Sequence, residues 1–187
     1  MDKINPLFTA TATAIGGRNG HTESSDGLVQ ADLSVPKAMG GPGKLGTATP
    51  EHLFAAGYAA CFGGSLDFVA KQKKKDASKA KVRCAVTIGV REAGGFGISV
   101  KMRVEDKSIG EAELATFVQE AHDKICPYSH ATRGNVEVTS MWSAVRDAAA
   151  AFEPEGAGGA RIQWTRFAHA IPTPRSSWRC CCPGSVA

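Results

Sequence analysis

The fold is decided by residues 49–62, which read Thr49-Pro50-Glu51-His52-Leu53-Phe54-Ala55-Ala56-Gly57-Tyr58-Ala59-Ala60-Cys61-Phe62. The stretch opens with the signals of a helix start, because a threonine N-cap is followed by proline at the first helical position and an acid in the first turn. We expect the helix to run to about Lys73. It is apolar nearly all round and rich in alanine and glycine, which predicts a central helix closely approached by other backbone.

Alternating patterns on both sides of this helix predict strands. In each of them polar or small residues alternate with apolar ones, which is the period of an extended chain with two different faces. Glycine-rich turns interrupt the patterns at residues 16–20 and 94–95. The expected strands cover residues 7–15, 28–35, 82–90, 98–104 and 136–141.

A second helix is expected to begin near Gly110-Glu111, since its apolar residues recur with helical spacing. It must end near Cys126, because Pro127 pushes the preceding residue out of helical geometry. The resulting order β-β-α-β-β-α-β predicts an α+β fold in which strands form antiparallel pairs and the helices pack on one face.

The chain has 187 residues, and the patterned part predicts one domain over residues 1–144. Residues 145–187 show no periodicity and recurrent proline and glycine, so we expect a disordered tail or an extension foreign to the fold. The formal net charge is +4. Most of the basic excess lies in residues 71–83, which favours a solvated helix end and loop over a nucleic-acid surface.

The start of the chain lacks a charged segment followed by an apolar run, so no secretory signal is expected. The longest uncharged apolar run, residues 53–66, is shorter than the ~18 residues that a membrane span requires. We therefore expect a cytoplasmic protein without a membrane span, in a compartment where thiols stay reduced.

Cys61, Cys84 and Cys126 lie in the patterned part of the chain. Cys84 shares the apolar face of its strand and is expected to be a packing residue. Cys61 lies inside an apolar helix, where burial without a cation raises the pKa of a thiol and makes it inert. Cys126 lies at a helix end, where the backbone mobility that a disulfide-forming cysteine needs is available.

A reactive Cys61 needs a positive group nearby, and Arg18 in the glycine-flanked turn is a candidate. Glu51 can hold that guanidinium as a bidentate partner. On one continuous helix, however, Glu51 and Cys61 are separated by about 15 Å along the axis. A long arginine, a bent chain or a second subunit must join them, and a solvated charge at the turn is the simpler interpretation of Arg18.

Other chemistry finds less support. Cys126 and His130 have the spacing of a metal-ligand pair, but Pro127 breaks the helix that would place them on one face, so no metal site is expected. The phosphate-binding, dinucleotide-binding and serine-nucleophile motifs are missing from the sequence, so no bound cofactor is expected.

Residues 49–62 closely resemble the peroxidatic helix of the organic hydroperoxide resistance proteins, a branch of the OsmC superfamily. The segment Ile125-Cys126-Pro127-Tyr128-Ser129-His130-Ala131-Thr132-Arg133-Gly134-Asn135 resembles the second cysteine segment of the same branch. The turn at residues 16–20 and the segment 33–42 also match, so the resemblance covers roughly residues 5–143.

The resemblance implies an intertwined homodimer, with antiparallel sheets wrapped around two central helices and two active sites at the subunit interface. It implies reduction of alkyl or fatty-acid hydroperoxides, with Cys61 as the attacking thiolate and Cys126 as its resolving partner. Arg18 is expected to stabilise the thiolate and Glu51 to hold Arg18, while lipoylated proteins restore the dithiol. Leu45, Phe54 and Phe96 are candidates for an apolar substrate pocket.

The competing hypothesis is a non-catalytic redox sensor or binding protein, in which oxidation of Cys61 and Cys126 only switches an interface.

Overall fold

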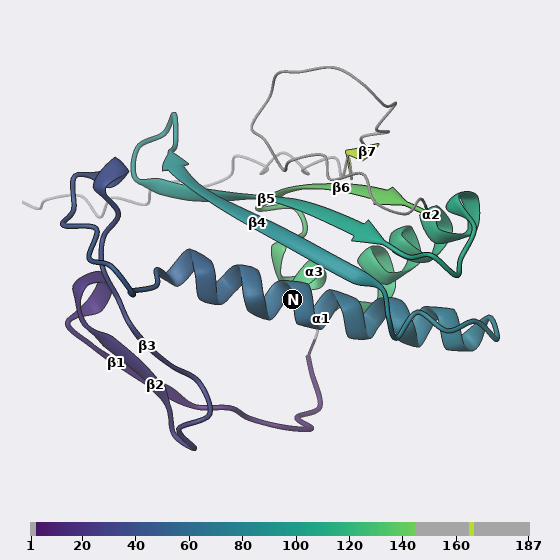
Figure 1. Cartoon of the computed structure of the whole chain (residues 1–187), viewed down its shortest axis with the longest axis horizontal. Coiled ribbons are helices and arrows are strands. Elements are labelled where there is room, and N and C mark those ends of the chain that lie inside the picture. Colours follow the sequence, from purple (N-terminus) through teal and green to yellow (C-terminus); the bar gives the residue numbers. More distant parts are fainter. Residues whose placement is uncertain (1–2, 145–164, 167–187) are drawn as a thin grey trace, which may run out of the picture.

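A long central helix, α1, separates two sheets (Figure 1). The computed structural model describes residues 3–144 and the short strand at residues 165–166. The N-terminal sheet has the order β1-β2-β3, and the second sheet has the order β4-β5-β6-β7. Between these strands lie the helices α1, α2 and α3, the short helical turns η1 (Gly17–Asn19) and η2 (Lys37–Met39), and the π-helical turn η3 (Ala121–Ile125).

Helix α1 spans Pro50–Gln72, as the sequence predicted. The Thr49 side chain accepts a hydrogen bond from the backbone N–H of His52, and the His52 ring accepts one from the backbone N–H of Thr49. This reciprocal capping satisfies two donors that a helix start otherwise leaves unpaired. Fully buried side chains such as Tyr58, Phe62 and Leu66 attach the helix to the rest of the fold, and each contributes about 1.5–3 kcal/mol.

α1 is also long and apolar enough to cross a membrane, judged by length and composition alone, with a mean hydropathy of 1.4. This criterion accepts up to two charged residues in an 18-residue window. The shorter run at residues 53–66 contains no charged residue at all, so the two criteria give different lengths. The helix nevertheless packs on β4, α2 and α3 of its own chain. Its buried residues join the hydrophobic core between sheet and helices.

The second sheet consists of β4 (Lys81–Val90), β5 (Phe96–Glu105), β6 (Glu137–Ser143) and β7 (Thr165–Arg166). β4 and β5 form the expected antiparallel hairpin, but β5 and β6 are parallel, so the expectation of antiparallel pairs throughout was wrong. The connection from β5 to β6 passes through helices, and such a crossover returns the chain in the same direction. The sheet is therefore mixed.

The helical connection consists of α2 (Glu111–Glu120), one π-helical turn, η3 (Ala121–Ile125), and α3 (Pro127–Thr132). Cys126 has the extended backbone angles φ −71° and ψ 117°, which confirms that the helix ends before Pro127. α3 was not expected from the sequence. Proline ends one helix but also favours the first position of the next, because its φ is already helical.

The N-terminal sheet consists of β1 (Ala12–Ile15), β2 (His21–Ser24) and β3 (Gln30–Asp32). β1 and β3 are shorter than expected, and β2 was missed because its residues lack apolar alternation. This sheet is set apart from the main body of the chain (Figure 1). Large apolar side chains remain exposed on it and on its flanking segments: Leu7, Phe8, Ile15, Leu28 and Val29.

The predicted tail, residues 145–187, lies outside the described residues except for β7. There, Thr165 and Arg166 pair antiparallel with Ser140 and Thr139 of β6. No strand was expected in this region from its sequence.

Candidate active site

Two cysteines distant in sequence meet where α1 passes beneath the turn between η3 and α3. The Sγ atoms of Cys61 and Cys126 lie 3.6 Å apart, and both thiols are free. Cys61 is partly exposed, whereas Cys126 is buried. The arrangement is one of a dithiol whose sulfur atoms need only a small movement to reach bonding distance.

The π-helical turn and the proline fix the position of Cys126. Its backbone N–H donates to the carbonyl of Ala121, five residues earlier, at 2.8 Å. Its own carbonyl accepts from the N–H of His130 at 2.9 Å, within α3. Single π turns occur often at functional sites. Here the turn lets the helix end with Cys126 directed at α1.

Burial raises the pKa of the Cys61 thiol above its ordinary value. The neighbouring Cys126 acts in the same direction, whereas a hydrogen bond from the backbone of Tyr128 acts against it. A thiol with a raised pKa is a poor nucleophile near neutral pH, because the thiolate is the reactive form. Within one chain, therefore, the environment of Cys61 does not activate it.

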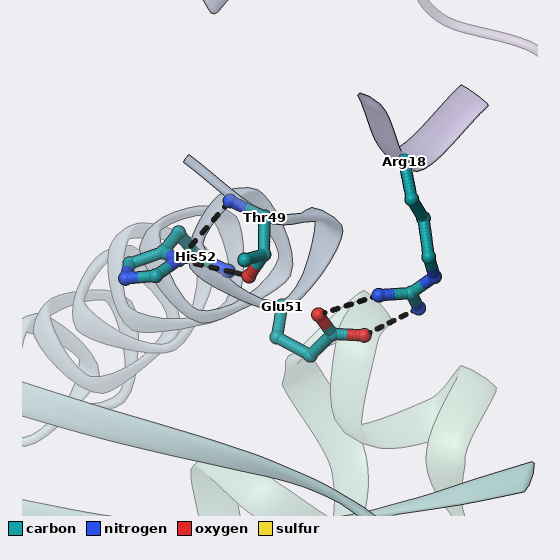
Figure 2. Close-up of polar contacts among 4 residues, drawn as sticks. All are labelled: Arg18, Thr49, Glu51 and His52. Carbon is teal, nitrogen blue, oxygen red and sulfur yellow. Dashed lines mark hydrogen bonds and ion pairs between the residues drawn. The ribbon is translucent and has the colours of Figure 1, made fainter. Parts of the chain in front are cut away.

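A second pair lies at the start of α1. The guanidinium of Arg18 donates two hydrogen bonds to the Glu51 carboxylate, at 2.6 and 3.0 Å (Figure 2). The Arg18 side chain is 37% exposed and that of Glu51 13%. The guanidinium lowers the pKa of Glu51, and the carboxylate raises the pKa of Arg18. Both groups are therefore charged at neutral pH.

Glycines shape the turn that presents Arg18. Gly16 and Gly17 have φ angles of 77° and 55°, in the left-handed region that side chains disfavour. They open the turn η1 (Gly17–Asn19). The Asn19 side chain then accepts a hydrogen bond from the backbone N–H of Val35 at 3.0 Å and ties the turn to the following loop. The backbone is thus folded so that the Arg18 side chain faces the first turn of α1.

The chain brings the candidate residues together as two pairs and not as one cluster. α1 is continuous from Pro50 to Gln72, so Glu51 and Cys61 lie on the same helix ten residues apart. That spacing corresponds to about 15 Å along the axis. α1 has no break between Glu51 and Cys61, and the bidentate pair holds Arg18 at the helix start.

Several side chains beside the dithiol were not predicted individually. The Tyr58 hydroxyl hydrogen-bonds with the hydroxyls of Ser129 and Thr132, at 3.0 and 3.3 Å, in the buried space between α1 and α3. The Tyr128 ring packs against those of Phe54 and Tyr58, with centroid distances of 5.9 and 5.7 Å. A signal was present, since hydroxyl and aromatic residues follow Cys126 directly, but which of them face α1 depends on α3.

The other predicted residues have mixed outcomes. Cys84 packs against the core, as expected, and burial raises its pKa to about 11. Of the candidate pocket residues, Phe54 packs against the core near the dithiol, whereas Leu45 is 100% and Phe96 66% exposed. Among the described residues, His, Cys, Asp and Glu side chains form no group of three or more suited to a metal ion.

Comparison with known proteins places this geometry in a family. Residues 41–141 match the family of OsmC-like proteins. The organic hydroperoxide resistance protein of Xanthomonas axonopodis pv. citri is 51% identical over 134 residues, which cover 71% of this chain and 92% of that protein. The organic hydroperoxide resistance protein OhrB of Bacillus subtilis is 46% identical over 133 residues, covering 71% and 95%.

Solved structures agree with the sequence comparison. The crystal structure of an organic hydroperoxide resistance protein from Legionella pneumophila superposes with a TM-score of 0.69 at 40% identity, covering 74% of this chain and 99% of that one. For the crystal structure of Bacillus subtilis OhrB the TM-score is 0.66 at 44% identity, with 74% and 100% covered. About a quarter of this chain therefore lies outside the match to these nearly complete relatives.

Proposed function

The chain belongs to the OsmC family, with organic hydroperoxide resistance proteins as its relatives, and on that premise we propose that it is a cysteine-based peroxidase. Its substrates are organic hydroperoxides of the alkyl or fatty-acid class, which it reduces to alcohols. The observation that carries the proposal is the 3.6 Å separation of two free thiols, one partly exposed and one buried. The exposed member of the pair is reachable by a peroxide, and the buried member is placed to react next.

The proposed reaction has two steps. The Cys61 thiolate attacks the distal peroxide oxygen, the O–O bond breaks, and the alkoxide leaves and takes up a proton as an alcohol. The sulfur is oxidised to a sulfenic acid. The Cys126 thiolate then attacks that sulfur, so the S–O bond breaks, the S–S bond forms, and hydroxide leaves as water. Disulfide formation protects Cys61 from irreversible over-oxidation.

Among the described residues, burial raises the pKa of the Cys61 thiol, so activation of this thiol requires a cation beside it. We propose that Arg18 of a second copy supplies the cation. The guanidinium is already oriented by Glu51 and is still partly exposed, so it has N–H groups available to a thiolate. A positive charge beside the sulfur favours the charged form and lowers the pKa of the thiol.

The uncovered apolar surface supports a homodimer. Ile15 of β1 is 76% exposed, and Leu28 before β3 is 84% exposed. On α1, one exposed stripe consists of small residues at four-residue spacing, namely Ala56, Ala60 and Gly64. Contiguous apolar surface of this kind is rare on monomeric proteins, and small residues let two helices approach closely. Two copies of α1 at the centre, with the N-terminal sheets wrapped around them, cover both surfaces.

An organic substrate is favoured by the apolar surroundings of the dithiol. Phe54 and the rings of Tyr58 and Tyr128 lie around the segment of α1 that leads to Cys61. An alkyl chain gains free energy on such a surface, whereas hydrogen peroxide has no apolar part to bury. Leu45 and Phe96 are exposed within one chain, and they contribute to a pocket only where a second copy covers them.

The reductant is proposed from the resemblance described above. In the reduced, dihydrolipoyl form, the lipoyl group of a lipoylated protein carries two thiols. These can open the Cys61–Cys126 disulfide by thiol–disulfide exchange, which returns both cysteines as thiols and oxidises the dihydrolipoyl group to its cyclic disulfide. A cytoplasmic location accompanies this proposal, because the cycle requires a compartment in which the dithiol is restored.

Steady-state reduction of an alkyl hydroperoxide, with dihydrolipoamide as electron donor, tests the function. We expect fast turnover that is lost in Cys61→Ser and much slower turnover with hydrogen peroxide. Cys84→Ser is the matched control, because it removes a thiol outside the proposed mechanism. One stoichiometric oxidation without turnover favours the redox sensor instead, and absence of any reaction with the thiol contradicts both functions.

A further inference from the structure

We propose that Tyr128 is a positioning residue for the disulfide-forming step: its ring, seated on α1 at Gly57, holds the segment of Cys126 against Cys61. The inference rests on the proposed function for its place in a catalytic cycle. The contact itself is a property of the fold and can be tested without a peroxide. It assigns a task to the aromatic side chain next to the Cys126-Pro127 pair.

The first support is the close approach at Gly57. A Cβ atom built on this glycine lies 3.1 Å from the Tyr128 hydroxyl oxygen and 3.3 Å from Cε2. Both distances are tighter than most contacts of a real Cβ atom, so a side chain at position 57 presses on the edge of the ring and the ring must give by a few tenths of an ångström. A glycine inside a helix costs about 1 kcal/mol relative to alanine. The close approach of the Tyr128 ring explains why a glycine occupies position 57 despite this cost.

The second support is the aromatic cluster that fixes the ring from the sides. Phe54 and Tyr58 are on α1 on either side of Gly57, four residues apart and thus on one helix face. The Tyr128 ring is tilted by 30° against Phe54 and by 55° against Tyr58. Aromatic pairs at such distances contribute roughly 0.5–1.5 kcal/mol beyond their buried area. The ring is therefore held in one place on the helix.

The third support is that this place determines the geometry at the dithiol. Tyr128 is separated from Cys126 by only Pro127, whose φ is fixed by its ring. Beneath the segment, the Tyr58 hydroxyl binds Ser129 and Thr132. The backbone of Tyr128 also hydrogen-bonds to Cys61. A shift of the ring therefore moves the 126–128 backbone and changes the 3.6 Å separation of the sulfur atoms.

The task does not depend on the Tyr128 hydroxyl, because Cε2 and Cζ of the ring, 3.3 and 3.5 Å from the Cβ position at Gly57, remain in phenylalanine. The side chain is 38% exposed, and its packing against α1 is that of an aromatic ring. Phenylalanine at position 128 therefore preserves this packing of the ring against α1, which we call the clamp, whereas alanine removes it. At Gly57, alanine introduces a methyl group in tight contact with the edge of the ring.

The experiment measures formation of the Cys61–Cys126 disulfide in the full reduced chain. Diamide is the oxidant: the two thiols lose two electrons and two protons, the S–S bond forms, and the N=N bond of diamide is reduced to a hydrazine. Quenching with an alkylating agent and peptide mass spectrometry separate this disulfide from oxidation of the other cysteines. In a second experiment, fresh samples of each reduced variant are treated with an alkyl hydroperoxide in place of diamide. Mass spectrometry then gives the ratio of the Cys61–Cys126 disulfide to Cys61 sulfinic acid.

We expect Tyr128→Ala to slow disulfide formation about tenfold or more, because small misplacements of reacting atoms have large kinetic effects. Tyr128→Phe should stay within about twofold of the unchanged chain, since the ring is retained. With peroxide, Tyr128→Ala should accumulate sulfinic acid at Cys61, and Tyr128→Phe should not. A role in stability alone would not shift this ratio.

Gly57→Ala should also slow the step, whereas Gly63→Ala is the matched control. A methyl group at Gly63 lies 3.7 Å from Cγ2 of Val82, which is an ordinary contact. Both substitutions gain the same helix propensity, so a difference between them reports the ring. This pair decides the matter if Tyr128→Ala fails to fold, as judged by circular dichroism and thermal melting.

Equal rates for Gly57→Ala and Gly63→Ala, or a folded Tyr128→Ala that forms the disulfide at the unchanged rate, would overturn the inference. So would a Tyr128→Phe variant as slow as Tyr128→Ala, since the hydroxyl would then be responsible. The proposed function fails separately: a clamp visible with diamide, without peroxide turnover, leaves the positioning role intact and removes the peroxidase.

Discussion

Arg18 donates two hydrogen bonds to Glu51 across 33 residues of sequence, and the bidentate pair joins the N-terminal sheet to the first turn of α1. Glu51 follows the capped Thr49-Pro50 start directly. The helix start therefore sets the position of the carboxylate, and the carboxylate sets the direction of the guanidinium. Predictions about activity and about stability both follow from this pair.

Glu51→Gln should reduce kcat/KM for an alkyl hydroperoxide by about tenfold or more, because the amide cannot hold the guanidinium as a charged bidentate partner. Glu113→Gln is the control, since it weakens the surface pair of Glu113 with Lys75 instead. Such exposed pairs contribute about 0–1 kcal/mol to stability. Equal activity of the two variants would contradict a role for Glu51.

The same pair predicts a pH dependence of stability. Arg18 lowers the pKa of Glu51 below its ordinary value in the folded chain. A lowered pKa stabilises the fold above the ordinary value of about 4.5, and this stabilisation is lost as the pH falls through the folded pKa. Urea unfolding between pH 7 and 3 should therefore show a smaller acid-induced loss in Glu51→Gln. An unchanged slope would show that the carboxylate titrates normally.

Cys84 predicts the opposite dependence at alkaline pH. Burial raises the pKa of its thiol from 9.0 to about 11. A raised pKa means that the folded chain keeps its proton longer, so the free energy of unfolding should fall as the pH rises from about 9 toward 11. Cys84→Ala should remove part of this decline. Alkylation at pH 8 should also modify Cys84 more slowly in the folded chain than after unfolding.

Tyr58→Phe should lower the free energy of unfolding by about 1–3 kcal/mol, because the buried hydroxyls of Ser129 and Thr132 lose a partner. Tyr128→Phe is the matched control, since it removes the same atom from a half-exposed position. Chemical denaturation of both variants measures the difference. Equal effects would show that the buried hydroxyl network contributes little.

The proposed exchange of Arg18 between copies can be tested by mixing two inactive variants. Arg18→Ala retains Cys61, and Cys61→Ser retains Arg18. Mixed dimers contain one site in which both residues are intact if Arg18 acts on the other subunit. In random reassortment, half of the dimers are mixed and each has one intact site of two, so the mixture should regain roughly a quarter of the activity of the unchanged protein per dimer. If the mixture stays inactive although mixed dimers form, Arg18 either acts on Cys61 of its own subunit or takes no part in the reaction.

Local signals determined much of the fold. The capped start of α1, its apolar circumference and the alternation in β4 and β5 depend on neighbouring residues, so the sequence predicted them. Long motifs around Cys61 and Cys126 also identified the family. β2 was not predicted because apolar and polar residues do not alternate in it. α3 was not predicted because Pro127 was interpreted only as the end of a helix. The direction of β6 follows from the crossover and leaves no pattern in the strand itself.

Family resemblance had suggested which residues pair, but only the tertiary structure shows how they meet. Cys61 and Cys126 are 65 residues apart and Arg18 and Glu51 33 apart, and periodicity within a segment carries no information about such contacts. The contact of Tyr128 with Gly57 is likewise a contact between distant residues, because it depends on the π turn, α3 and one face of α1 together. The sequence thus specifies the elements and the reactive residue types, whereas packing of α1 against the turn at Cys126 brings the two sulfur atoms together.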